Sequence, residues 1–267
     1  MSWVKLLMIS LFSRKFLPNE IVLSLVEYYE KNDIFFKTSE YYESLKKELL
    51  LNKKIAHNTF KGFIHNSRNN IYTDFFFVSR RKKNIKKAIE KNIFCGDILY
   101  LKPNLWDKST SIEFEHVLKE CELNYLIIDL RGSPGGYLKT CINICNLLLP
   151  KCEIVSLNYR NKKTTIYSDQ NYKKFKKIFI LVDKMTASSS EILSYSLYTN
   201  LNNVVLLGEK TFGKNFGQDK IFNKKYNFCF IVPSFFWGIT GFSYDNISMK
   251  PIKKSFLDEV NSYVKFW

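Results

Sequence analysis

The residues best suited to chemistry lie in two short segments in the second half of the chain. Segment 186–191 reads TASSSE and contains Ser188 in a run of small residues. Segment 208–218 reads GEKTFGKNFGQ and contains Lys214 and Gln218. A serine hydroxyl is a weak nucleophile until a base removes its proton, and an uncharged lysine amine can be that base. The two segments together therefore predict nucleophilic chemistry by a Ser/Lys pair.

Ser188 is expected at the junction of a strand and a helix. An apolar run at 178–182 predicts the strand, and Glu191-Ile192-Leu193 opens the helix. Backbone N–H groups and the helix dipole at such a place favour a developing negative charge. The same letters also make an ordinary N-cap with a capping box, so a purely structural role stays open.

Lys214 is a base only if its amine is neutral. At neutral pH this requires the pKa of a lysine to fall by ~3 units from its usual value. Burial against an apolar sheet lowers the pKa, and the uncharged Gln218 could hold the amine without stabilising its protonated form. The alternative is one more surface cation among 41 lysines and arginines.

A glycine-rich stretch follows the most apolar run of the chain. Residues 125–130 read YLIIDL, and residues 131–136 read RGSPGG. Consecutive glycines allow backbone N–H groups to point into a cavity, as in an oxyanion hole. The stretch lacks the lysine and spacing of a P-loop and the spacing of a dinucleotide-binding loop. A structural strand-to-helix turn is the other interpretation.

The elements expected to position these segments alternate between strand and helix. Apolar runs predict strands at 97–101, 125–130, 153–156, 178–182, 204–207 and 228–232. Helices are expected at 111–122 and 141–149, after Ser188, and at 255–267. This order predicts an α/β fold with a mainly parallel sheet for residues 93–267.

Residues 1–92 have a different sequence pattern, which predicts a small, mostly helical region. Pro18-Asn19-Glu20 and Thr38-Ser39-Glu40 are helix-start signals, and a third helix is expected at 84–91. One strand is expected near 75–78.

Composition restricts the possible partners. The net charge of +16 suits an anionic partner, but the run at 80–83 (RRKK) lacks the interleaved aromatic residues of a single-strand binder. Charge spread over a solvated surface is the simpler interpretation. We expect no nucleic-acid partner. The apolar N-terminal segment 1–12 is expected to pack on the protein or touch a membrane, or else to be a poor signal peptide.

The chain has six cysteines and three histidines, without metal-binding spacing or a disulfide pattern, so we expect no metal and a reducing compartment. The histidines, at 57, 65 and 116, do not follow strand ends near Ser188, which disfavours a Ser-His-Asp triad.

Three stretches in this order, LIIDLRGSPGG, TASSSEI and GEKTFGKNFGQ, resemble the C-terminal processing (tail-specific) proteases of the S41 serine peptidase family. The resemblance covers about residues 94–252. It implies a catalytic core of the ClpP/crotonase-like fold and cleavage of polypeptides, near their C-termini, without a cofactor. Ser188 matches the nucleophile of the family, Lys214 the base and Gln218 its support.

The resemblance also implies oxyanion donors at Gly135 or Gly136 and at Ser189. One departure is Asn215 in place of a glycine after the lysine. Another is Ser189 in place of the common alanine, so that Ser188, the expected nucleophile, and Ser190 have a competing hydroxyl between them. Only about 20 residues separate the strand near 75 from the core strand near 97, too few for the PDZ domain of most family members.

A substrate is expected to add as an extended strand beside an apolar wall containing Phe235, Phe236 and Trp237, although these aromatic side chains are also suited to the core.

The resemblance points to the cell envelope, whereas the weak signal sequence and the unpaired cysteines allow the cytoplasm. Two other functions stay open: an inactive peptide-binding relative, and a basic protein that binds nucleic acid or a membrane surface, whose binding would weaken steeply with salt.

Overall fold

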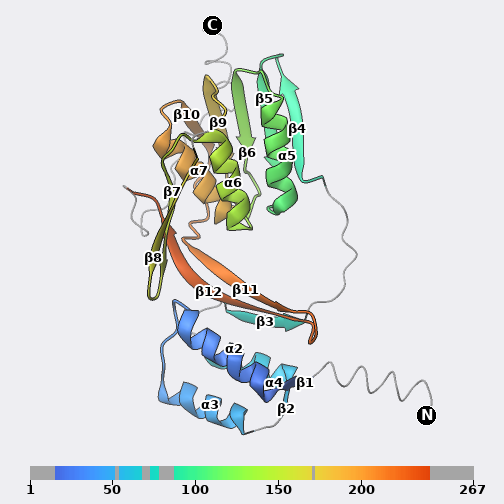
Figure 1. The fold of residues 1–267 in the computed structure, drawn as a ribbon, viewed down its shortest axis with the longest axis vertical. Helices are drawn as coiled ribbons and strands as arrows, with labels where there is room; N and C mark the ends of the chain where they lie inside the picture. The colour runs from blue at the N-terminus through green and yellow to red at the C-terminus, as the bar shows by residue number, and fades with distance from the viewer. Residues whose placement is uncertain (1–15, 52–53, 68–72, 78–86, 170–171, 241–267) are drawn as a thin grey trace, which may run out of the picture. The chain divides into compact units, whose positions relative to one another are not determined.

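The computed structural model describes residues 16–51, 54–67, 73–77, 87–169 and 172–240. The chain divides into two compact units (Figure 1). The first unit takes its described residues from 1–83, 158–162 and 216–236, and the second from 84–157, 163–215 and 237–267. The first unit therefore contains two later segments besides the leading region.

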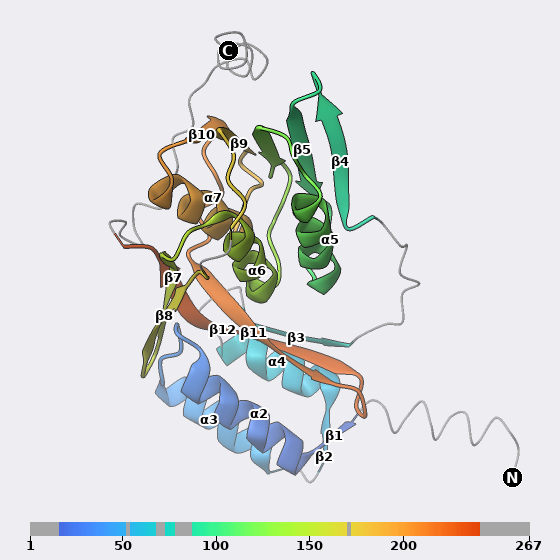
Figure 2. The same ribbon diagram turned by 45° about the horizontal axis from the view of Figure 1, so that its top comes forward.

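In its described residues, the first unit combines three helices with two small groups of strands (Figure 2). The helices are α2 (Asn19–Asn32), α3 (Glu40–Leu50) and α4 (His57–Ser67). Strands β1 (Phe16–Pro18) and β2 (Lys54–Ala56) pair antiparallel. Strand β12 (Phe228–Gly238) pairs antiparallel with both β11 (Phe216–Asn223) and β3 (Asp74–Phe77).

Aromatic side chains form the core of this unit. Tyr29, Tyr42, Phe60, Phe75 and Phe230 are all buried and belong to one cluster that joins the helices to β3 and β12. Phe60 and Phe75 meet edge to face with centroids 4.9 Å apart, a favoured arrangement for aromatic rings. The expected start of the second helix is confirmed, since Ser39 caps α3 by accepting a hydrogen bond from the Tyr42 amide.

The second unit is built on a five-stranded sheet with the order β10-β9-β6-β5-β4. The strands are β4 (Ile89–Phe94), β5 (Ile98–Pro103), β6 (Tyr125–Asp129), β9 (Lys177–Val182) and β10 (Val204–Gly208). The pairings β10–β9, β9–β6 and β6–β5 are parallel, and β5–β4 is antiparallel. This sheet is mainly parallel, as its alternating sequence pattern predicts, while the first unit pairs antiparallel, so the fold is mixed α/β.

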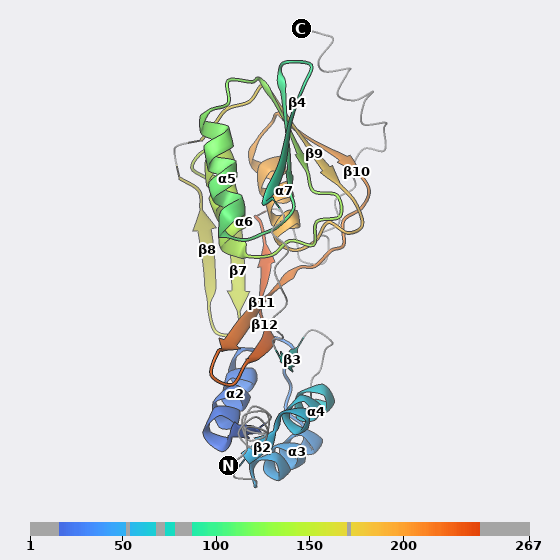
Figure 3. The ribbon, with the colours of Figure 1, turned by 90° about the vertical axis from the view of Figure 1, so that its right-hand side faces the viewer.

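Helices α5 (Lys108–Lys119), α6 (Leu138–Leu148) and α7 (Ser189–Asn200) connect these strands and pack against one another in that order. Figure 3 shows α5 and α6 on the same side of the sheet. Every residue of β6 is buried, which explains its continuous apolar sequence. Strands β7 (Glu153–Tyr159) and β8 (Lys163–Tyr167) lie next to each other in a second sheet.

The helix expected at 84–91 is wrong for its described part, because Ile89–Phe94 form the edge strand β4. This strand is exposed after its first residue, and its Glu and Lys side chains are typical of an edge that must not pair with other chains. Antiparallel pairing with β5 outweighs the local helical preference of these residues. The apolar segment 1–12, the basic run 80–83 and the closing helix 255–267 lie outside the described residues.

No helix within the described ranges is both long and apolar enough to cross a lipid bilayer.

Candidate active site

The carboxyl end of β9 leads into the segment that carries Ser188, residues 183–189, which we call the serine turn. Helix α7 begins at Ser189, and Ser188 occupies its N-cap position. Ser188 has φ 55° and ψ −120°, a region that side chains with a Cβ rarely occupy. Such strain costs about 1–3 kcal/mol and persists only where surrounding contacts enforce it. Its presence at a serine on a helix start favours a functional role for the turn.

The three consecutive serines differ in their accessibility. Ser190 is fully buried, and its Oγ lies 2.8 Å from Ser133 Oγ. Ser189 is 2% exposed and donates from its Oγ to the Gly136 carbonyl at 2.9 Å. Ser188 is partly exposed. Of the three hydroxyl groups, that of Ser188 is therefore the one best placed to meet a substrate.

The glycine turn, residues 131–136, lies directly against the serine turn. Gly135 has φ +76°, and a methyl group on its Cα would come within 2.5 Å of the Ala187 oxygen and 2.7 Å of the Ser189 nitrogen. The Cβ of Ser188 is 3.3 Å from the same point. Two segments far apart in sequence thus approach more closely than any residue other than glycine permits at this position. The structure brings Gly135, Ser188 and Ser189 together.

Trp106 closes the other side of the glycine turn. A methyl group on Gly136 would lie 2.4 Å from Trp106 Cβ, and the Trp106 carbonyl accepts a hydrogen bond from the Tyr137 amide at 3.0 Å. The indole Nε1 donates to Ser133 Oγ at 2.7 Å, and Ser133 Oγ in turn meets Ser190. This buried chain of contacts fixes the glycine turn relative to α7.

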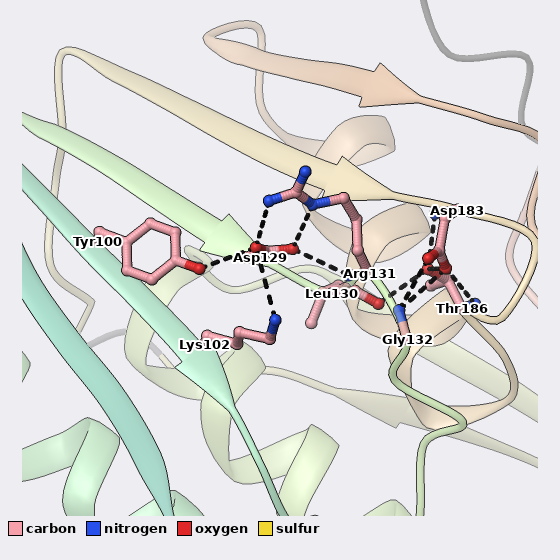
Figure 4. A network of polar contacts seen from close by, with 8 residues as sticks. All are labelled: Tyr100, Lys102, Asp129, Leu130, Arg131, Gly132, Asp183 and Thr186. Carbon is pink, nitrogen blue, oxygen red and sulfur yellow. Dashed lines mark hydrogen bonds and ion pairs between the residues drawn. The ribbon is translucent and has the colours of Figure 1, made fainter. Parts of the chain in front are cut away.

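A polar network anchors the start of the glycine turn (Figure 4). Asp129 at the end of β6 has a fully buried carboxylate, which accepts from Arg131 Nε at 2.9 Å and Nη2 at 2.7 Å. Tyr100 donates to the same carboxylate at 2.8 Å. Burial alone would raise the pKa of Asp129, but the hydrogen bonds from the Arg131 side chain and backbone and from Tyr100 hold it below its ordinary value. Asp129 is thus kept ionised where β6 ends.

A second carboxylate in the network connects the glycine turn to the serine turn. Asp183 accepts from the Gly132 amide at 3.0 Å and from the Met185 amide at 3.0 Å. Thr186 Oγ1 donates to the Leu130 carbonyl at 2.8 Å, so the serine turn is also joined to the residue just before the glycine turn. Figure 4 shows these contacts beside the Asp129 group.

The loop that carries Lys214, residues 209–215, is called the lysine loop. It is joined to the serine turn by a hydrogen bond from the Phe212 amide to the Thr186 carbonyl at 2.9 Å. Trp237 holds its other end, because the indole Nε1 donates to the Lys214 carbonyl at 2.9 Å and the Trp237 amide donates to Asn215 at 2.9 Å.

Glu191 brings Ser188 and Lys214 to one place. Its Oε2 accepts from the Ser188 amide at 2.6 Å and from the Lys214 amide at 3.0 Å. Two nitrogens bonded to one oxygen lie within about 6 Å of each other, given the usual length of such bonds. The backbones of the two residues that the sequence singled out therefore meet, although a whole helix and strand separate them in sequence.

The other predicted site residues lie in strands β11 and β12. Gln218 lies on β11 opposite Pro233, just after a register shift at Gly217/Gln218. Phe235 is 8% exposed and packs on the Tyr159 ring, and Phe236 lies 5.5 Å from Phe35, centroid to centroid. These aromatic contacts belong to the first unit. Participation of Gln218, Phe235 and Phe236 in the site stays a prediction.

Trp237 is 1% exposed, so in this structure its ring offers almost no surface to a substrate. Its contacts to Lys214 and Asn215 give it the role of holding the lysine loop.

Sequence reasoning missed the residues that join the segments. The sequence pattern indicates Glu191 only as part of a capping box, and it does not single out Asp183, Trp106 or Ser133. The capping-box spacing was the one available signal, because contacts between distant loops leave no local pattern. Among the described residues, no group of three or more His, Cys, Asp or Glu side chains could hold a metal ion.

The close approach of Gly135 can be tested by stability. Gly135→Ala should lower the free energy of unfolding by more than Gly132→Ala, because its methyl group meets backbone atoms. Gly132 is the matched control, since it has φ +71° and open space around its Cα. In both variants the left-handed backbone lowers the free energy of unfolding by ~1–2 kcal/mol. In Gly135→Ala overpacking lowers it by about 1–3 kcal/mol more. Equal losses in chemical denaturation would contradict the packing described.

The Asp129–Arg131 pair predicts a pH-dependent effect on stability. Because the folded-state pKa of Asp129 is lowered, the stability it contributes is present above the ordinary aspartate pKa of about 3.9 and is lost as the pH falls through the folded-state value. Arg131→Met should cost about 1–3 kcal/mol at pH 7 by leaving a buried carboxylate underpaired, and less as the pH is lowered.

Denaturant unfolding of both proteins between pH 7 and pH 3 measures this difference. The double variant Asp129→Asn/Arg131→Met serves as the control, and it should be less sensitive to pH than Arg131→Met. A cost of Arg131→Met that stays constant over this range would show that the ion pair does not act through the charge of Asp129.

Comparison with known proteins places this site in a family. Residues 97–228, about half of the chain, match the model of peptidase family S41. The carboxyl-terminal-processing protease of Synechocystis is 38% identical over 104 residues, which are 39% of this chain and 24% of that protein. The carboxy-terminal processing protease CtpA of Bacillus subtilis is 39% identical over 90 residues, 33% of this chain and 19% of that protein. The chain thus matches less than a third of the length of either relative.

Solved structures show the same fold. A lipoprotein from Streptococcus agalactiae superposes with a TM-score of 0.74 at 18% identity, covering 93% of this chain and 96% of that one. The photosystem II D1 C-terminal processing protease gives a TM-score of 0.51 at 18% identity, covering 71% of this chain and 49% of that one. The family match includes the glycine turn, the serine turn and the lysine loop. By this match, residues 97–228 belong to peptidase family S41.

Proposed function

We propose that this chain is a serine endopeptidase that cleaves polypeptides, near their C-termini, with Ser188 as nucleophile and Lys214 as general base. The observation that carries the proposal is the shared acceptor: one Glu191 oxygen binds the amides of both residues. A chance pair of surface residues would have no reason to be joined through a buried carboxylate. The family match over residues 97–228 supports the reaction class.

In the proposed reaction, neutral Lys214 removes the proton from Ser188 Oγ as this oxygen attacks the scissile carbonyl carbon. The tetrahedral intermediate collapses with cleavage of the C–N bond, and the lysine returns the proton to the leaving amine. A water molecule, deprotonated by the Lys214 amine, then attacks the acyl ester. The bond from Ser188 Oγ to the acyl carbon breaks, the lysine returns the proton to Oγ, and the new carboxyl terminus is released. Gln218 is proposed as the residue that supports Lys214.

The oxyanion is proposed to be stabilised by backbone N–H groups of the glycine turn, at Gly135 or Gly136, together with that of Ser189. The close approach of Gly135 to Ser189 supports this arrangement, because such donors must lie on both sides of one oxygen atom. The strained backbone of Ser188 turns the residue away from an ordinary N-cap conformation.

For the second unit we propose the ClpP/crotonase-like architecture. Support comes from the parallel order β5, β6, β9 and β10 and from the helices that connect them.

Phosphonate labelling tests the proposed roles. A fluorophosphonate that reacts with activated serines should label the wild type and fail to label Ser188→Ala. Labelling of Lys214→Ala should fall by about 10²–10⁴-fold, the usual contribution of a general base. Ser190→Ala should still be labelled, because its buried hydroxyl does not face a substrate.

Lys210→Ala is the matched control, because it removes an exposed lysine from the same loop and should leave the rate unchanged. Labelling that persists in Ser188→Ala would assign the nucleophile elsewhere. Wild-type protein that is folded yet never labelled, at any pH, would point to a peptide-binding relative without turnover.

Two exposed apolar side chains are proposed to contact the substrate. Phe212 and Met185 are 60% and 54% exposed, and a backbone hydrogen bond from Phe212 to Thr186 joins their segments next to Ser188. Apolar surface at a catalytic edge is available to bind a substrate side chain.

This contact predicts a change in binding. Phe212→Ala should raise KM several-fold, on the order of 1 kcal/mol of lost apolar burial, while kcat changes little. Peptide hydrolysis followed by fluorescence provides both constants. Ile112→Ala removes a similarly exposed apolar side chain from α5 and serves as the control. An unchanged KM would remove Phe212 from the substrate site.

A further inference from the structure

The carboxylate of Glu191 is the most completely enclosed charged group near the proposed dyad. Glu191 lies in the first turn of α7 and is 0% exposed. Four donors surround it. Its Oε1 accepts from Thr211 Oγ1 at 2.8 Å and from the Gly213 amide at 2.7 Å. Its Oε2 accepts from the amides of Ser188 at 2.6 Å and Lys214 at 3.0 Å.

This pattern exceeds what a helix cap requires. In a capping box the glutamate binds back to the N-cap amide, here that of Ser188. The other three donors, Thr211 Oγ1 and the amides of Gly213 and Lys214, all come from the lysine loop. Glu191 therefore connects two segments that the helix itself does not need to connect.

Burial of this charge has an energetic cost. Desolvation raises the pKa of the Glu191 carboxyl, and the hydrogen bonds from Thr211, Gly213, Ser188 and Lys214 oppose the rise. A charge in the interior is disfavoured unless such donors surround it. A neutral side chain would cap the helix at a lower desolvation cost, which indicates that the carboxylate does more than cap the helix.

We propose that Glu191 is a positioning residue, whose carboxylate holds the backbone of Lys214 against that of Ser188 so that amine and hydroxyl meet. It touches no substrate. The part of this inference that concerns rate rests on the proposed Ser/Lys mechanism, whereas the bridge between the two segments stands independently of it.

The donors also predict how substitutions rank. At Oε2 both partners are amide N–H groups, which can only donate. At Oε1 one partner is the Thr211 hydroxyl, which can reverse and accept. Glu191→Gln should therefore keep its oxygen toward Ser188 and Lys214 and turn its NH2 group toward Thr211, leaving only the Gly213 amide without an acceptor. Glu191→Leu keeps the approximate volume and releases all four donors.

Amide hydrogen exchange followed by NMR tests the bridge without requiring any activity. In the wild type, the amides of Ser188, Gly213 and Lys214 should be protected. Exchange in Glu191→Gln should rise at Gly213 and not at Ser188 or Lys214. In Glu191→Leu it should rise at all three. Asp97→Asn is the matched control, because this carboxylate accepts from Asn124 before β6 begins, at the opposite end of the strand from the glycine turn.

Steady-state hydrolysis of a quenched fluorescent peptide tests the effect on rate. Relative to the wild type, kcat should fall by about 10²-fold in Glu191→Leu, the effect of misplacing catalytic groups by about an ångström. The fall should be smaller in Glu191→Gln, and KM should stay within about threefold in both. Normalising to the folded fraction removes simple loss of protein, and Asp97→Asn should keep the wild-type kcat.

Each outcome decides a separate point. Unchanged protection of Ser188 and Lys214 in folded Glu191→Leu would overturn the bridge. Increased exchange with an unchanged kcat would overturn the positioning role. A wild type that neither hydrolyses peptide nor reacts with phosphonate would refute the proposed function, and the exchange data would still test the bridge. If Glu191→Leu does not fold, the test is Glu191→Gln alone. Faster amide exchange at Gly213 but not at Ser188 or Lys214 would support the bridge, and unchanged exchange at Gly213 would contradict it.

Discussion

A buried carboxylate is stable only where enough hydrogen-bond donors surround it, and this requirement organises the site. Glu191 takes three of its four donors from main-chain amides in two different segments. Main-chain donors cannot move without moving the chain, so satisfying the charge fixes the path of both segments. The buried Asp129 applies the same constraint to the end of β6, and the partly exposed Asp183 adds hydrogen bonds that hold the glycine turn. Three acidic side chains thus position three loops around one serine.

The second constraint is steric. Gly135 and Gly136 are pressed between the serine turn and Trp106, at distances that no Cβ atom could occupy. Ser188 adopts a positive φ in the same small volume. Close approach and local strain bring the glycine turn against the start of α7, which is the arrangement that the proposed oxyanion site requires. The parallel sheet makes this possible, because the carboxyl ends of β6 and β9 lie at the same edge.

The chain leaves the second unit directly after the lysine loop. Residues 216–236 enter the first unit, where they form β11 and most of β12 and pack with the aromatic core of the helices. Trp237 then returns to hold Lys214 and Asn215 through its indole and its amide. The lysine loop is therefore fixed on one side by Glu191 and on the other by Trp237.

The sequence by itself determined the elements with strong local patterns and the candidate catalytic residues. The apolar runs of β5, β6, β9 and β10 predicted the parallel sheet, and Ser39 predicted the start of α3, because periodicity and caps are local properties. Strand β4 was mistaken for a helix, and β8 and β11 were missed, because their exposed, polar residues form strands only through pairing with neighbours.

The tertiary structure alone decided which side chains meet. It buried Ser189 and Ser190 and left Ser188 partly exposed, and it placed the buried Trp237 in contact with the lysine loop. It also showed that Glu191, besides capping α7, joins the backbone of Ser188 to that of Lys214. These outcomes depend on desolvation and on hydrogen bonds between segments many residues apart, and neither leaves a signature in the local order of amino acids.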